Sequence, residues 1–277
     1  MSAAAQSNLL PDGQRLHLHH GPIDLIIDAD SPLRTTLYTR ATLRFQSILS
    51  GLAEELSNLR QPLAPNSRFA DPVARRMQDA VAPFSDVFVT PMAAVAGAVA
   101  DEILAAMSLG PDVPKVYVNN GGDIAFHLSD GATMRCVSPA GGLEVTPEMP
   151  VRGVATSGWD GRSHSFGIAD AVTVLARSAA AADVAATLIA NAVDLPGHPA
   201  IRRLPANALS PDSDLADRAV TTSVGDLSFS EISQALQRGV TRASHLRDRG
   251  LIEGAALCLK GEVRCVPEQL KERMPDA

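Results

Sequence analysis

The segment Ala93–Met107 constrains the fold more than any other part of the sequence, because it consists almost entirely of alanine, valine, leucine and isoleucine. A helix that is apolar on most sides is buried on most sides. We do not expect the longer stretch Val87–Met107 to cross a membrane, since Pro91 and the neighbouring Asp101 and Glu102 interrupt it. These two acidic residues either lie on a narrow solvent-facing stripe or have a role inside the core. The segment therefore predicts a globular protein built around a buried helix.

Strand and helix patterns are intermixed along the chain without a regular strand–helix–strand alternation, which favours an α+β fold over a doubly wound sheet. No internal repeat or linker divides the chain, so we expect one domain over residues 1–277, with residues 1–13 and 267–277 as flexible tails. The expected helices are Thr36–Leu59, Pro72–Val81, Ala93–Met107, Ala179–Val193 and Ser228–Gly239. The expected strands are Gln14–His20, Ile23–Ile27, Lys115–Val118, Ile124–Leu128, Val151–Thr156, Ala171–Ala176, Gly254–Leu259 and Val263–Val266.

The charge pattern argues against nucleic acid as a partner. The net charge is −7 and no basic run exceeds two residues, whereas nucleic-acid binding needs lysine and arginine gathered on one face. The N-terminal residues contain no apolar signal-peptide core, so we expect a cytoplasmic protein with no membrane partner. The three cysteines, Cys136, Cys258 and Cys265, form no CxxC pair and are expected to be reduced, buried thiols.

Three histidines, His17, His19 and His20, lie close together in the first expected strand. His17 and His19 would share one face of that strand, as two metal ligands can. No third ligand is evident nearby in the sequence. We therefore interpret this run as a solvated strand edge.

The first candidate site segment comprises Asn119, Asn120, Gly121, Gly122 and Asp123, which lie between two expected strands. The glycines allow positive φ angles and a close approach of the backbone to a ligand. Two amides and a carboxylate supply hydrogen-bond donors and acceptors beside that backbone. An ordinary β-hairpin is the alternative, because Asn-Gly is the strongest short hairpin signal.

The second candidate is a polar, glycine-rich loop that begins with Thr156, Ser157 and Gly158 at the end of an expected strand. Loops of this composition often carry function. Arg162 is a candidate anion clamp, and His164 is a candidate general acid or base. The Thr156 and Ser157 hydroxyls could bind phosphate oxygens or act as nucleophiles.

The third candidate is the pair Asp183 and Thr187 within the alanine-rich segment Ala179–Val193. A separation of four residues places both side chains on one helix face, about one turn apart. A carboxylate and a hydroxyl are hard oxygen ligands suited to Mg²⁺, which often also binds ligand phosphates. The alternative is that Asp183 lies near the helix start and only stabilises the positive end of the helix dipole.

The three motifs, in this order, resemble the ApbE family of FAD:protein FMN transferases. The resemblance is carried by a strand followed by Asn-x-Gly-Gly-Asp, a strand followed by Thr-Ser-Gly, and an Ala-Asp-x-x-x-Thr helix. Across roughly Ile23 to Cys265, the chain more closely resembles an uncharacterised bacterial and archaeal branch with an ApbE-like fold. This resemblance implies a T-fold-related α+β domain whose mixed and antiparallel sheets pack against helices.

By this resemblance, Asp183 and Thr187 hold Mg²⁺ at the diphosphate of FAD, while Asn120–Asp123 and Thr156–Gly158 line the flavin site. The chain departs from the transferases after Thr-Ser-Gly, where it keeps His164 but lacks their Pro and Thr-Gly turn. The candidate catalytic residues are His164, Arg162, Asp170 and Ser157.

The implied activity is a Mg²⁺-dependent transferase or hydrolase that acts on FAD, FMN or a related small phosphorylated cofactor. Two alternatives stay open: a cofactor-binding or metabolite-binding protein without catalysis, and an enzyme of small-molecule cofactor metabolism that does not use flavin. The apolar Ala93–Met107 helix is compatible with a homodimer.

Overall fold

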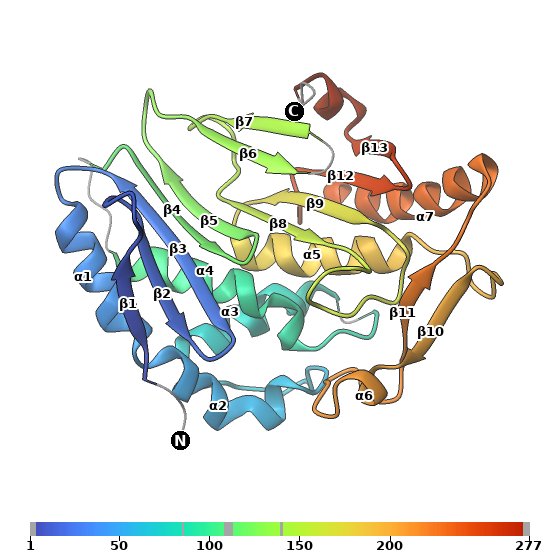
Figure 1. Ribbon diagram of the computed structural model, residues 1–277, viewed down its shortest axis with the longest axis horizontal. Coiled ribbons are helices and arrows are strands. Elements are labelled where there is room, and N and C mark those ends of the chain that lie inside the picture. Colours follow the sequence, from blue (N-terminus) through green and yellow to red (C-terminus); the bar gives the residue numbers. More distant parts are fainter. Residues whose placement is uncertain (1–3, 85, 108–112, 139–140, 274–277) are drawn as a thin grey trace. The chain divides into compact units, whose positions relative to one another are not determined.

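The computed structural model describes residues 4–84, 86–107, 113–138 and 141–273. Its internal contacts divide the chain into two compact units. The first comprises Met1–Met134, Val145–Val154 and Arg177–Ala181, and the second comprises Arg135–Glu144, Ala155–Ala176 and Ala182–Ala277. The expected α+β class is confirmed, since helices accompany antiparallel sheets in Figure 1. That both units belong to one domain stays a prediction.

The first unit contains an antiparallel sheet with the strand order β1, β2, β3, β4, β5, which continues into the start of β8. The helix α4 packs against β4 and β5, and α1 and α3 pack against α4. The strands are β1 (Gln6–Leu9), β2 (Leu16–His20), β3 (Ile23–Asp30), β4 (Lys115–Asn120), β5 (Asp123–Leu128) and β8 (Gly153–Ser157). The helices are α1 (Arg34–Phe45), α2 (Ile48–Leu59), α3 (Pro72–Val81), η1 (Ala82–Phe84), η2 (Pro91–Ala94) and α4 (Val95–Ala106).

In the second unit, β9, β12 and β13 form an antiparallel series that α7 covers. Two small two-stranded sheets, β6–β7 and β10–β11, complete it. The strands are β6 (Met134–Ser138), β7 (Gly141–Val145), β9 (Ala171–Ala176), β10 (Ile201–Pro205), β11 (Ala219–Val224), β12 (Gly254–Leu259) and β13 (Glu262–Val266). The helices are α5 (Ala179–Ala192), whose first three residues belong to the first unit, α6 (Ala206–Leu209), α7 (Phe229–Asp248) and η3 (Glu268–Arg273).

Most expected elements are present with shifts of a few residues, but the single helix expected over Thr36–Leu59 is wrong. The chain forms α1 and α2 there, separated at Gln46 and Ser47. The Ser47 hydroxyl donates to the Arg44 carbonyl and accepts from the Arg44 guanidinium, at 3.3 and 2.8 Å. Serine side chains that bond the local backbone in this way compete with helix continuation.

The helix expected over Ser228–Gly239 is also longer than predicted, because α7 continues to Asp248. Gly239 does not end this helix. A Cβ atom there would lie 2.4 Å from Val193 Cγ2 and 2.6 Å from Leu257 Cδ2, so the glycine permits close packing within the second unit. The segments expected as tails contain β1, which pairs with β2, and the short helix η3.

The start of α7 provides a test of stability against pH. Ser228 and Glu231 form a capping box, and His198 lies 2.9 Å from the Glu231 carboxylate. Hydrogen bonds from the Ser228 side chain and backbone, followed by that from His198, lower the pKa of Glu231 to about 2. The ionised carboxylate therefore stabilises the folded chain at neutral pH.

We expect this contribution to be lost as the pH falls from about 4.5, the ordinary carboxyl pKa, to about 2. Chemical unfolding of the wild type and E231Q at a series of pH values measures it. The wild type should lose more stability than E231Q across this window. The control E54Q removes an exposed carboxylate on α2 and should follow the wild type. Parallel profiles for E231Q and the wild type would contradict the prediction.

Asp101 and Glu102 on α4 are used inside the first unit, so the interpretation as a solvent-facing stripe is wrong. Glu102 is buried and receives hydrogen bonds from Arg44 and Arg76, each at 2.8 Å. The carboxylate of Asp101 accepts the backbone N–H groups of Ala179 and Ala180, at 3.0 and 2.9 Å. Asp101 thus caps the N-terminus of α5 from another helix.

Two glycines bring the backbone close to the same helix start. A Cβ atom at Gly97 would lie 2.3 Å from the Ala179 carbonyl oxygen. A Cβ atom at Gly153 would lie 2.1 Å from the Ala179 nitrogen and the Ser178 carbonyl carbon. Since real Cβ contacts do not reach such distances, only glycine fits these positions without a backbone shift.

Within the described residues, none of the helices combines the length and apolar character that a bilayer-spanning segment requires.

Candidate functional site

The segment Asn119–Asp123 forms a β-hairpin in the first unit, in agreement with the alternative reading of the motif. Asn120 pairs with Asp123, which leaves Gly121 and Gly122 as the loop. Both glycines have positive φ angles, +65° and +115°, as a tight primed turn requires. Asn119 Oδ1 accepts the Gly122 N–H at 2.8 Å and closes the turn. The glycines are therefore explained by backbone conformation, and their role in ligand binding stays a prediction.

Asn120 has a structural task on the other face of this hairpin. Its side chain is buried, and its amide nitrogen donates to the Ala96 carbonyl at 3.0 Å. That bond fixes the hairpin to the first turn of α4. A buried polar group needs a hydrogen-bond partner, so the Asn120 amide has a structural role here. Asn119 and Asp123 are the half-exposed side chains of the motif.

The motif Thr156, Ser157 and Gly158 lies at the end of β8, in the second unit. Thr156 is exposed and its hydroxyl lies 2.8 Å from the Thr173 hydroxyl on β9, while Ser157 is half-buried. A Cβ atom at Gly158 would lie 2.2 Å from the Asp170 carbonyl oxygen. Gly158, at the start of the loop, therefore allows the backbone to lie close to Asp170, at the end of the loop. This close approach holds the Thr156 and Ser157 hydroxyls at the end of β8.

Asp170 holds the loop in place through its carboxylate. Its hydrogen bonds favour a positioning role over the predicted catalytic role. Its carboxylate accepts the Trp159 indole N–H at 3.1 Å and the Lys260 backbone N–H in the β12–β13 turn. Lys260 has a φ angle of +50°, which is uncommon for a residue with a side chain. Asp170 thus holds together the loop, the tryptophan and a strained turn.

The remaining predicted catalytic residues lie on the solvent side of the same loop. Arg162 is exposed. His164 is half-buried, and its Nε2 lies 3.3 Å from the Ser210 hydroxyl. Among the described residues, no hydrogen bond connects His164 with Ser157 or Asp170, so the structure contains no nucleophile–base pair built from these side chains.

The pair Asp183 and Thr187 lies on α5, within the second unit. Both side chains are half-buried, whereas Ala182, Val184–Ala186 and Leu188–Ala190 around them are buried. The two oxygen-bearing groups therefore emerge together from an apolar helix. A carboxylate and a hydroxyl one turn apart can supply two ligands to a divalent cation such as Mg²⁺.

The sequence reading missed a third member of this stripe, Asn191, four residues beyond Thr187. Its Oδ1 accepts the Ser165 hydroxyl at 3.1 Å and the Phe166 N–H at 2.8 Å. Since Ser165 and Phe166 follow the Thr156–Gly158 motif in the same loop, Asn191 ties that loop to the helix that carries Asp183. The regular spacing 183, 187 and 191 was the signal that could have revealed it.

A glycine supports the same contact. A Cβ atom at Gly167 would lie 2.0 Å from the Ala190 carbonyl oxygen, and the Ile168 N–H donates to the Val193 carbonyl at 2.8 Å. The loop therefore lies directly on the C-terminal end of α5. Two of the three predicted motifs, the Thr-Ser-Gly loop and the Asp/Thr helix, are joined in one unit through Asn191 and Gly167.

The cysteines offer no activated thiolate. Burial raises the pKa of Cys136 to about 11, and burial together with the charge of Asp170 raises the pKa of Cys258. The pKa of Cys265 is raised by burial as well. Because the thiolate is the nucleophile, these protonated thiols do not support cysteine catalysis. All three are free, and Cys136 and Cys258 are buried as expected.

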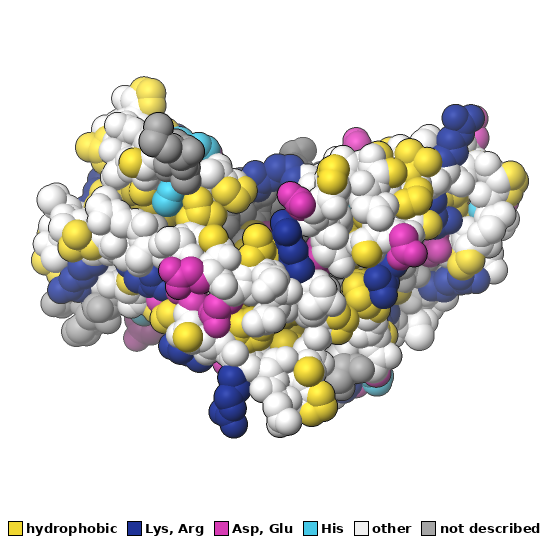
Figure 2. All heavy atoms as spheres, turned by 90° about the horizontal axis from the view of Figure 1, so that it is seen from below, with side chains coloured by type: hydrophobic (Ala, Val, Ile, Leu, Met, Phe, Trp, Pro, Cys, Tyr) yellow, Lys and Arg dark blue, Asp and Glu magenta, His cyan; other side chains and the backbone are white. Residues whose placement is uncertain are grey.

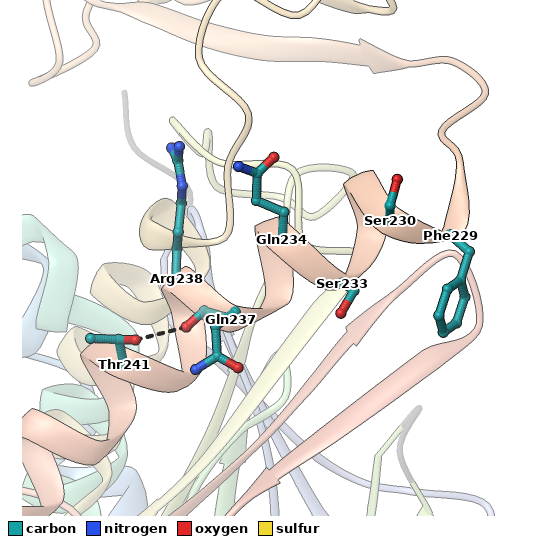
Figure 3. A pocket seen from close by; sticks show the side chains of 7 residues that line it. All are labelled: Phe229, Ser230, Ser233, Gln234, Gln237, Arg238 and Thr241. Carbon is teal, nitrogen blue, oxygen red and sulfur yellow. Dashed lines mark hydrogen bonds between the residues drawn. The ribbon is translucent and has the colours of Figure 1, made fainter.

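A groove along α7 contains none of the predicted residues. Figure 3 shows its lining side chains, all from α7: Phe229, Ser230, Ser233, Gln234, Gln237, Arg238 and Thr241. It offers amides, hydroxyls and one guanidinium but no carboxylate, histidine or cysteine, so it lacks a candidate acid, base or nucleophile. On the face displayed in Figure 2, acidic and basic side chains are interspersed and do not form a basic patch.

Comparison with known proteins gives one family match that covers most of the chain. The model of the family described as "AbpE bacteria" matches residues 7–265. The chain is also 40% identical to the "UPF0280 protein" of Methanothrix thermoacetophila over 131 residues, 45% of this chain and 53% of the relative. A protein of the same name from Archaeoglobus fulgidus is 40% identical over 106 residues, 38% of this chain and 45% of the relative. The chain thus spans about half the length of the curated relatives that it matches.

Among solved structures, the chain is similar to the flavinyl transferase ApbE of Pseudomonas stutzeri in its apo form. The TM-score is 0.42 and the sequence identity is 13%, over 99% of this chain and 98% of that protein.

Proposed function

Because the chain belongs to the AbpE bacteria family, we propose that it is a Mg²⁺-dependent transferase or hydrolase that acts on FAD or a related flavin nucleotide. One observation carries the proposal: Asp183 and Thr187 share a polar stripe on the otherwise apolar helix α5, and Asn191 binds the Thr-Ser-Gly loop to that helix. The proposed metal pair and a hydroxyl-rich strand end are thereby parts of one packed unit.

The donor set fits Mg²⁺ better than a softer cation. Asp183 and Thr187 offer only oxygen atoms, and their half-buried positions leave room for water and phosphate oxygens as the other ligands. Bound there, Mg²⁺ would neutralise the negative charge of the FAD diphosphate.

The proposed reaction is cleavage of the diphosphate at the phosphorus on the riboflavin side. An acceptor hydroxyl, from water or a second substrate, forms a new P–O bond, the bridging P–O bond breaks, and AMP leaves. Thr156 and Ser157 donate hydrogen bonds to the phosphate oxygens, and Arg162 supplies a positive charge. His164 takes the proton of the attacking hydroxyl. Asp170 keeps the loop in position through Trp159 and Lys260.

The direct test incubates the purified chain with FAD and Mg²⁺ and separates the nucleotides by chromatography. We expect release of AMP and either FMN or an FMN-modified acceptor, and we expect EDTA to stop it. Calorimetry with FAD runs in parallel, because it measures binding without turnover. The absence of both turnover and FAD binding would contradict the flavin proposal.

A second candidate, a flavin-nucleotide-binding protein without catalysis, is favoured by the hydrogen bonds within the loop. The His164 ring contacts Ser210, and the Asp170 carboxylate is used by Trp159 and Lys260. Among the described residues, neither group forms a hydrogen bond with Ser157, the candidate nucleophile of the loop. FAD binding that depends on Mg²⁺ but yields no AMP would select this candidate.

A further inference from the structure

Two histidines of β2, His17 and His19, lie beside the carboxylate of Asp24 in the folded first unit. Asp24 lies on β3, directly opposite His19 in the antiparallel register. One carboxylate oxygen is 3.1 Å from His17 Nε2, and the other is 3.2 Å from His19 Nδ1. One ligand atom from each of the three residues lies within 4.8 Å of the others. The strand edge interpreted from the sequence is therefore an organised cluster of two imidazoles and a carboxylate.

The strand register separates this cluster from the rest of the histidine run. His17 and His19 point away from the buried residues Leu16 and Leu18, because side chains alternate across a strand. His20 points to the opposite face, where its ring lies 6.2 Å from that of Phe45. Only two of the three histidines can therefore bind one ion with Asp24.

The cluster is accessible and has further oxygen donors beside it. The side chains of His17, His19 and Asp24 are 32%, 43% and 45% exposed. On the adjacent strand β1, Gln6 and Asn8 pair with His19 and His17 and so share their face. An ion held by the three residues would keep open coordination positions toward solvent.

We propose that His17, His19 and Asp24 form a binding site for a divalent transition-metal ion, with Zn²⁺ as the best-fitting ion. Two ligands that each lie about 2.0–2.1 Å from a tetrahedral Zn²⁺ ion are roughly 3.3 Å apart, and each imidazole lies at about this distance from one of the two Asp24 oxygens. Two imidazoles select zinc, cobalt, nickel or copper over magnesium and calcium. Three protein ligands with an open position are typical of zinc sites that bind water or a substrate. Its three ligands all belong to the first unit, and none of them is part of the Mg²⁺ pair of the proposed function.

The test uses the full chain without a histidine tag, freed of metal by a chelator that is then removed. Zn²⁺ is titrated by calorimetry, and Co²⁺ is titrated by its visible absorption. We expect one saturable site per chain, with Co²⁺ bands of nitrogen and oxygen coordination. D24N, H17Q and H19Q should each weaken Zn²⁺ binding about tenfold or more, since each removes or impairs one of three ligands.

H20Q is the matched control, because it changes a histidine of the same strand that faces away from the cluster. Its Zn²⁺ affinity should equal that of the wild type. Circular dichroism of each variant verifies that it is folded, and H245Q on α7 provides a second, exposed histidine control. The proposal fails if the wild type shows no saturable binding, or if H20Q weakens binding as much as H17Q does. It also fails if Co²⁺ gives a thiolate charge-transfer band, which would place the ion on a cysteine.

Discussion

The substitution G153A is expected to lower the free energy of unfolding by about 3 kcal/mol or more. The added Cβ atom would lie 2.1 Å from two backbone atoms of Ser178 and Ala179. A flexible side chain could move away from such a contact, but these atoms belong to the start of α5, which Asp101 holds through two hydrogen bonds. The overlap can therefore be relieved only by a shift of the backbone. Chemical unfolding followed by circular dichroism measures the loss.

Two further variants show whether the helix start is the cause. G161A places a methyl group in an exposed loop, where the nearest atom is 3.3 Å away, and should change the stability by less than about 0.5 kcal/mol. G97A should resemble G153A, because its Cβ atom would lie 2.3 Å from the Ala179 carbonyl oxygen. Equal stabilities for G153A and G161A would contradict this prediction, because they would show that the backbone at the start of α5 can shift without a loss of folding free energy.

The substitution D183A is expected to reduce the Mg²⁺-dependent release of AMP from FAD by a factor of about 100 or more. It removes the charged member of the proposed metal pair while the adjacent alanines and valine of α5 remain packed. T187A removes the neutral member and should reduce the rate less. T187S keeps the hydroxyl and should recover most of the wild-type rate. The rate at increasing Mg²⁺ concentration measures the effect.

The dependence on Mg²⁺ distinguishes a metal ligand from a residue that only stabilises the helix. If Asp183 binds Mg²⁺, D183N should require a higher Mg²⁺ concentration for half of its maximal rate. Its unfolding midpoint should stay close to that of the wild type, because asparagine has the same shape and Asp183 is half-buried. An unchanged Mg²⁺ requirement in D183N would remove Asp183 from the metal site, whatever the rate.

The helices were predictable from the sequence where local signals and packing agree. Pro72–Val81 matches α3, because Asp71 caps it through Val73 and Ala74 and Pro72 occupies its first turn. Gly239 misled the prediction of α7, since a glycine that ends helices in most settings serves here to admit Val193 and Leu257. That contact joins residues distant in the chain, and no local pattern contains it.

The candidate site likewise has features that the sequence predicts and features that it does not. The spacing of Asp183 and Thr187 places them correctly on one face of α5, because that relation depends only on helix geometry. The roles of Asp170 and Asn191 could not be read in this way. Asp170 acts on Lys260, which lies ninety residues further along, and Asn191 acts on Ser165 and Phe166. Such pairings arise from the folded chain and require its coordinates.

The fixed start of α5 restricts changes in chain length more than changes in residue type. Only Arg177 and Ser178 separate β9 from this helix, and Asp101, Gly97 and Gly153 hold its first residues in place. Each residue of an α-helix turns the next by about 100°. One residue inserted between Ala180 and Asp183 would therefore swing the carboxylate and the Thr187 hydroxyl into the alanine-packed side. This stretch can vary in sequence at its half-exposed positions, but an insertion or deletion there would move Asp183 and Thr187 away from their common half-exposed face.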